Sequence, residues 1–212
     1  MHPRQSRYIA VIGELIDSKK ITDRSQFQDH LQTGLAAISK QTSIASPYTI
    51  ILGGEFQAVY RSGQSLFSNL FAIRALLHPE SCRFAIAIGG LNTPINPAQA
   101  IGMDGPAFHK AREAIITLKA EKEQLAITGL SRSMKALVDP LVNLLWASTG
   151  NWNANRLEVL VGLMKGQTER ELANRLDLSE RAIYRNLKDG QLREWANLIR
   201  EVEMRITQVL DI

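Results

Sequence analysis

Residues 47–60 read PYTIILGGEFQAVY, two apolar runs on either side of a pair of glycines. Residues 47–52 and 55–60 each have the length and the β-branched or aromatic content of a strand. Gly53 and Gly54 tolerate the positive φ angles that a tight turn between antiparallel strands requires. This stretch therefore predicts a β-hairpin.

The segments on either side of the hairpin predict further strands and helices. Residues 8–13 (YIAVIG) and 83–89 (RFAIAIG) are apolar runs typical of buried strands. Residues 25–41 begin with a serine that a glutamine follows three positions later, which predicts a capped helix, and residues 65–77 have helical apolar spacing. The predicted order is β-α-β-β-α-β, the ferredoxin-like arrangement of an antiparallel sheet with both helices on one face.

The composition indicates a globular protein of one or two domains. The chain has 212 residues, of which 45% are hydrophobic and 22% are charged, as in folded proteins with a buried core. Its single cysteine, Cys82, excludes an intrachain disulfide and fits a reducing compartment. Because the chain has neither an apolar N-terminal run nor an apolar stretch of about 20 residues, we expect a cytoplasmic protein without membrane contact.

A polar break at residues 149–153 divides the sequence into two predicted domains. Before the break, helical patterns cover residues 106–124 and 131–148. We therefore expect an α+β, ferredoxin-like domain over residues 1–150 and an all-α domain over residues 151–212.

Residues 154–188 have the pattern of a helix-turn-helix DNA-binding module. Thr168 begins a capping box with Glu171, and Ser179 is a natural N-cap for a second short helix. Polar side chains on the second helix and at both helix N-termini could contact base edges and phosphates of double-stranded DNA. The expected DNA-contacting residues are Thr168, Ser179, Arg181, Tyr184, Arg185 and Lys188. The alternative is a small helical bundle that binds protein.

Two further features bear on the DNA-binding hypothesis. Residues 151–212 hold ten Lys/Arg and ten Asp/Glu, so any DNA contact must come from local placement of charge. After Gly190, apolar residues recur at heptad spacing up to Val209, a seam that either pairs with a second subunit or packs on its own domain. We expect a homodimer, because such modules usually read paired half-sites.

Three stretches resemble the SatD family. They are VIGELIDSKK at residues 11–20, ASPYTIILGGEFQAVY at residues 45–60, and IGMDGPAFHKAREAI at residues 101–115. The resemblance covers most of the chain and includes the C-terminal helix-turn-helix. It does not by itself imply a biochemical activity.

The N-terminal arrangement is also similar to the palm-like domain of nucleotide cyclases and polymerases. That resemblance implies Mg²⁺ ions held with a nucleotide by carboxylates at the end of the first strand and in the hairpin. The matching positions hold Glu14, Asp17 and Glu55, whereas Gly54 stands where the resemblance places an aspartate. The missing acid weakens two-metal chemistry but is compatible with a degenerate ligand or metal site.

Residues 101–115 supply a second group of candidate residues. Asp104 precedes a predicted helix on which His109, Arg112 and Glu113 fall near one face. Arg112 could clamp a phosphate, and His109 could donate a proton to a small anionic ligand. The alternative is a capped helix with an ion-paired surface.

We therefore expect a DNA-binding transcriptional regulator of the SatD type, whose N-terminal domain senses a ligand or mediates dimerisation. The alternative is a nucleotide-binding or nucleotide-cyclase-like enzyme with a degenerate metal site. A third hypothesis is an adaptor whose C-terminal helices contact protein.

Overall fold

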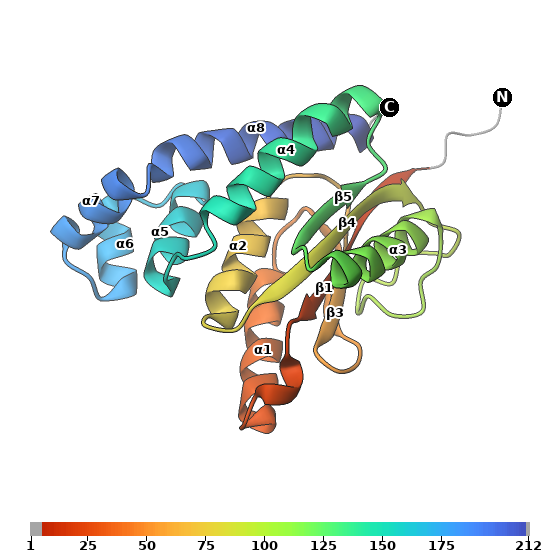
Figure 1. Ribbon diagram of the computed structural model, residues 1–212, viewed down its shortest axis with the longest axis horizontal. Coiled ribbons are helices and arrows are strands. Elements are labelled where there is room, and N and C mark those ends of the chain that lie inside the picture. The colour runs from red at the N-terminus through yellow and green to blue at the C-terminus, as the bar shows by residue number, and fades with distance from the viewer. Residues whose placement is uncertain (1–5, 211–212) are drawn as a thin grey trace.

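A mixed five-stranded sheet with the strand order β2-β3-β1-β4-β5 is the centre of this α+β protein, as its computed structural model shows for residues 6–210 (Figure 1). The strands are β1 (Arg7–Leu15), β2 (Ile44–Ile50), β3 (Glu55–Tyr60), β4 (Cys82–Gly90) and β5 (Leu125–Thr128). The helices are α1 (Arg24–Ile38), α2 (Leu66–Leu77), α3 (Pro106–Glu121), α4 (Arg132–Ser148), α5 (Ala154–Met164), α6 (Glu169–Leu176), α7 (Glu180–Asp189) and α8 (Leu192–Leu210), with a 3-10 turn η1 (Ser18–Lys20). Within residues 6–210, no helix combines the length and apolarity needed to cross a membrane.

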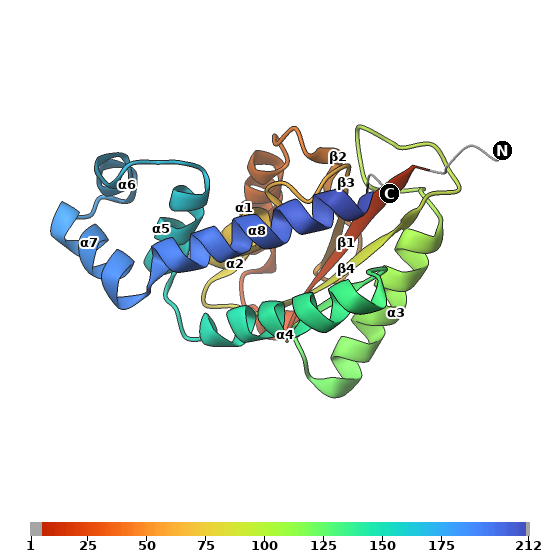
Figure 2. The ribbon, with the colours of Figure 1, turned by 90° about the horizontal axis from the view of Figure 1, so that it is seen from above.

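Both faces of the sheet are covered by helices. Side chains alternate between the faces of a strand, and β1 is apolar on both: Ile9 and Val11 join the hydrophobic cluster that includes α1 and α2, whereas Ala10 and Ile12 join the cluster that includes α3. Figure 2 shows α1 and α2 on one side of the sheet and α3 on the other. Residues 9–13 of the central strand β1 are therefore buried.

The element order matches the sequence-based expectation up to β4, with two differences along the chain. Helix α1 is capped by Asp23, whose carboxylate accepts a hydrogen bond from the backbone N–H of Gln26 at 3.0 Å, so the expected cap at Ser25 is wrong. Helix α3 ends at Glu121, and β5 follows it parallel to β4. Strand β5 was not expected, because four residues are too short to establish a strand pattern.

Helices α5 to α8 pack into the same hydrophobic cluster as α1 and α2. Thr168 forms its capping box with Glu171, and Ser179 caps α7, as expected. The heptad seam of α8 is buried within the chain, since Leu192, Ile199 and Ile206 are all 0% exposed. The division at residue 150 and the homodimer stay predictions.

A carboxylate on α8 caps the N-terminus of α2. Ser65 has a positive φ of 61° and makes no side-chain cap. Instead, Glu203 accepts hydrogen bonds from the backbone N–H groups of Ser65, Phe67 and Ser68 at 2.8 to 3.2 Å. Burial raises the pKa of Glu203 to about 7, although these three hydrogen bonds favour the charged form. Glu203 thus links α8, the last helix, to the N-terminus of α2.

This buried carboxylate predicts a stability that depends on pH. Because the pKa of Glu203 is higher in the folded chain than in the unfolded chain, the free energy of unfolding should fall as the pH rises through about 7. The change should amount to roughly 3 kcal/mol between pH 5 and pH 8, and Glu203→Gln should lack it. Urea unfolding at several pH values measures both, with Glu201→Gln, an exposed position on α8, as control. A pH dependence shared by all three proteins would contradict this assignment.

Candidate functional site

Three charged side chains form a row across the ends of the three strands β3, β1 and β4. Glu14 on β1 lies opposite Glu55 on β3 and opposite Arg83 on β4. These residues follow the alternation of Ile12 and Ala85, which belong to the cluster with α3, so their side chains lie on the α3 face. The register of β1 therefore brings two carboxylates and a guanidinium together at one end of the sheet.

Helix α3 adds two cations above this row. Arg112 donates two hydrogen bonds to Glu55, from Nη1 to Oε2 at 2.5 Å and from Nη2 to Oε1 at 2.6 Å. Lys119, two turns further along α3, places Nζ 2.6 Å from Oε1 of Glu14, whose Oε2 accepts from Arg83 at 3.3 Å. We call these five residues, Glu14, Glu55, Arg83, Arg112 and Lys119, the charged cluster.

Arg112 and Lys119 of α3 lie on the solvent side of the charged cluster. The side chains of Glu14 and Glu55 are 18% and 15% exposed, whereas those of Arg112 and Lys119 are 47% and 46% exposed. The hydrogen bonds from Arg112 to Glu55, together with the charges of Glu55 and Glu14, raise the pKa of Arg112. With three cationic and two anionic side chains, the cluster carries an excess of one positive charge.

The residues do not fit the two-metal site of a palm-like enzyme. Asp17 lies beyond β1, exposed at the start of η1 with a φ of 56°. A Cβ atom on Gly54 would lie 2.9 Å from Cδ1 of Leu15, and the φ of +95° is unfavourable for a side chain, so an aspartate there is strained. Between residues 6 and 210, no three His, Cys, Asp or Glu side chains are grouped to hold a metal ion.

The candidate residues at the start of α3 do not lie together in one site. Oδ1 of Asp104 lies 2.7 Å from Nε2 of His109, and both side chains are more than half exposed. Arg112 instead reaches Glu55, and Glu113 lines a cavity beside β5. Of this second group, Arg112 is the residue that lies in the same cluster as Glu14 and Glu55.

Sequence reasoning missed two members of the charged cluster. Lys119 follows Arg112 by seven residues, the spacing of one helix face over two turns, and this spacing could have revealed it. Arg83 stands at the start of a predicted strand, but its partner becomes known only with the register between β1 and β4. A local sequence pattern does not indicate which residues of two strands lie opposite each other.

Of the residues expected to contact DNA, Thr168 and Ser179 are the N-caps of α6 and α7, and the other four lie on α7. The hydroxyl groups of Thr168 and Ser179 accept hydrogen bonds from the backbone N–H groups of Glu171 and Ala182 at 3.3 and 3.2 Å. The side chains of Arg181, Tyr184, Arg185 and Lys188 are exposed on α7, as are those of the acidic residues Glu180 and Asp189.

Comparison with known proteins gives one family. The SatD family matches residues 8–200 of the chain. Among solved structures, two of a bacterial light-regulated adenylyl cyclase give TM-scores of 0.41 and 0.40, each at 13% identity. These matches cover 59% and 60% of this chain and 77% and 44% of the cyclase chains. MupZ from Pseudomonas fluorescens gives 0.30 at 16% identity, over 65% of this chain and 97% of that chain. Among curated protein sequences, none matches.

These findings correct the expected function: the interpretation as a DNA-binding transcriptional regulator is wrong. Neither the matching family nor the named structures are described as DNA-binding. The apolar pattern that suggested the module has another explanation, because Leu172, Ile183 and Ile199 are buried in the cluster that also contains α1 and α2. A helical pattern of this kind is produced equally by packing on the chain's own sheet layer.

The geometry of the hairpin makes an acidic side chain unfavourable at position 54. Gly54→Asp should lower the free energy of unfolding by roughly 1 to 3 kcal/mol more than Gly53→Asp, because it adds steric overlap to backbone strain. A Cβ atom at Gly53 meets nothing within 4 Å, so this variant is the matched control. Urea unfolding of both variants is the measurement, and equal losses would contradict the steric explanation.

Proposed function

The chain belongs to the SatD family, and we propose that it binds a nucleotide through its phosphates at the charged cluster, without the two metal ions of a cyclase. The observation that carries this proposal is the layering of the cluster, in which two half-exposed cations lie over two nearly buried carboxylates. The carboxylates hold Arg112 and Lys119 in place, and the cations face the ligand.

The donors on α3 suit a chain of phosphates. Arg112 has five N–H donors, of which two bind Glu55. The ammonium group of Lys119 has three donors, and one carboxylate oxygen lies beside it. Because the two residues are two helical turns apart, their remaining donors can bind different phosphate groups.

An apolar side chain between the two cations favours a nucleotide over inorganic phosphate. Ile116 lies on the same side of α3, one turn from Arg112 and one turn from Lys119, and it is 59% exposed. Covering an exposed apolar side chain of this size with a flat base removes apolar surface from water, which favours binding. The site therefore combines phosphate donors with an apolar contact for a base.

The same proposal assigns the ferredoxin-like, palm-like fold to the N-terminal part. The order β1-α1-β2-β3-α2-β4 and the antiparallel pairing in the order β2-β3-β1-β4 support it. Helices α6 and α7 are assigned the packing of a helix-turn-helix pair, as a structural unit.

Nucleotide binding that needs no metal is the first expected result. Isothermal titration of the full chain with ATP or GTP should give a saturable isotherm in EDTA, because cationic side chains supply the positive charge. Arg112→Ala and Lys119→Ala should each weaken binding about tenfold or more, whereas Arg170→Ala, an exposed arginine on α6, should not. An isotherm that requires Mg²⁺, or one that both variants leave unchanged, would contradict the proposal.

The role of Ile116 predicts a difference between two ligands. Ile116→Ser should weaken ATP binding several-fold by removing the apolar contact, while binding of inorganic tripolyphosphate should stay the same. Competition titrations with the two ligands measure this difference. An equal loss for both ligands would show that the variant disturbs the phosphate contacts instead.

A further inference from the structure

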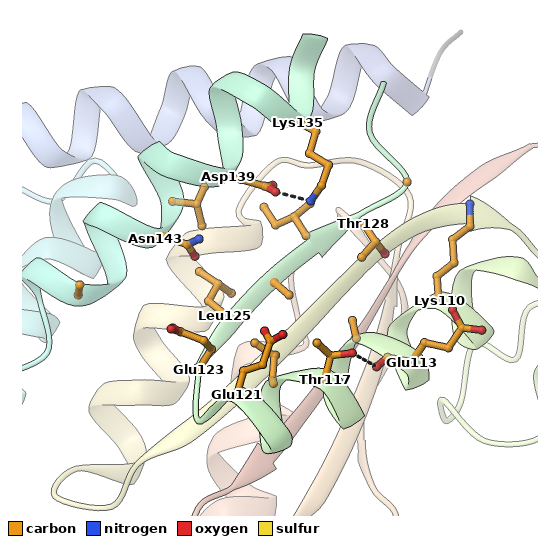
Figure 3. A pocket seen from close by; sticks show the side chains of 17 residues that line it. Lys110, Glu113, Thr117, Glu121, Glu123, Leu125, Thr128, Lys135, Asp139 and Asn143 are labelled. Carbon is orange, nitrogen blue, oxygen red and sulfur yellow. Dashed lines mark hydrogen bonds and ion pairs between the residues drawn. The ribbon is translucent and has the colours of Figure 1, made fainter. Parts of the chain in front are cut away.

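A cavity of about 860 Å³ lies beside β5 on the opposite flank of α3 from the charged cluster. Figure 3 shows its two walls: Glu113, Thr117 and Glu121 come from α3, and Lys135, Asp139 and Asn143 come from α4. Strand β5 lies between these walls. The cavity is therefore a groove along the edge of the sheet.

Strand β5 is an edge strand that lines this groove. Strand β5 is the last strand of the sheet and pairs with β4 alone. The N–H of Phe84 donates to the carbonyl of Gln124 at 2.7 Å, so in a parallel ladder the backbone groups of Leu125 and Ile127 point away from β4. Open N–H and C=O groups of this kind pair with an added extended chain.

The two walls differ in chemistry, and an added strand would meet both. Side chains of a strand alternate between its two faces. On the α4 side, Val142 is buried at 2% exposure, so Lys135, Asp139 and Asn143 form the wall. On the α3 side, Glu113 and Glu121 line the groove. One set of side chains of the added strand would thus meet the polar wall of α4, and the other set would meet the carboxylates of α3.

The groove keeps an excess of negative charge. Lys135 forms an ion pair with Asp139, so the charges of these two residues cancel. Three further carboxylates, those of Glu113, Glu121 and Glu123, line the groove and form no ion pair with any residue from 6 to 210, against one other lysine, Lys110. The charge favours a basic partner.

We propose that this groove binds an extended peptide segment with basic side chains at alternate positions, which adds to β5 as a further strand. Backbone hydrogen bonds hold the segment, its basic side chains face Glu113 and Glu121, and the side chains between them lie along α4. This assignment goes beyond the proposed nucleotide site, which lies on the other flank of α3, and each can fail without the other.

Three labelled peptides test the assignment by fluorescence anisotropy with the full chain. The probe is a capped peptide of alternating lysine and valine. One control replaces the lysines with glutamates, and the other carries N-methyl groups on alternate backbone nitrogens. The lysine–valine peptide should bind saturably, and both controls should bind about tenfold more weakly or not at all. Equal binding of the N-methylated peptide, or no binding of the probe, overturns the proposal.

Variants of the protein locate the binding site. Glu121→Lys/Glu123→Lys reverses charge at the groove, and Asn143→Trp fills it; the wild-type side chains at all three positions are exposed, so the core stays intact. Both variants should weaken binding about tenfold, with Thr117→Trp on the other wall as a second blocking variant. The matched control, Glu194→Lys/Glu201→Lys on α8, should bind as the wild type does. Unchanged binding to the groove variants, or a dimer in light scattering that Asn143→Trp dissociates, overturns the proposal.

Discussion

The register of β1 between β3 and β4 is the constraint on which the rest of the site depends. It places Glu14 opposite Glu55 on one neighbour and opposite Arg83 on the other. A shift of one residue would turn Glu14 toward the apolar layer of α1 and α2 and would bring Leu15 to the α3 face. Since both faces of β1 are otherwise apolar and buried, burying an unpaired carboxylate makes this shift costly. The same packing that fixes the fold therefore fixes the charges.

Close approach of α3 to the sheet completes the charged cluster. A Cβ atom on Gly89 of β4 would lie 2.9 Å from the backbone nitrogen of Ala107, so glycine is required where the helix begins. The buried face of α3 continues with small side chains at Ala107, Ala111 and Ala114. Because the helix lies near the sheet, Arg112 and Lys119 reach the carboxylates below while their outer surfaces face solvent. The opposite flank of the helix forms the wall of the groove at β5.

Much of the local structure could be predicted, because its causes are local. The hairpin at residues 47–60, the capping box at Thr168 and the N-cap at Ser179 depend on neighbours within a few positions. Long-range features could not be predicted in this way. Glu203 caps a helix that begins 137 residues earlier in the chain, at Leu66, and the partners of Lys119 and Arg83 follow from strand register. The heptad seam of α8 shows the same limit, since one apolar spacing is compatible with a partner subunit and with the chain's own core. The homodimer expectation rested on that seam, whereas the mistaken DNA-binding interpretation rested on the helical pattern of residues 154–188.

The most direct test of the nucleotide site is a map of amide chemical shifts. Backbone resonances of the labelled full chain would be recorded by nuclear magnetic resonance as ATP is added in the presence of EDTA. We expect the largest changes along α3 between Arg112 and Lys119 and at their partners Glu14 and Glu55. Changes confined to α6 and α7, or changes that appear only after Mg²⁺ is added, would contradict this expectation.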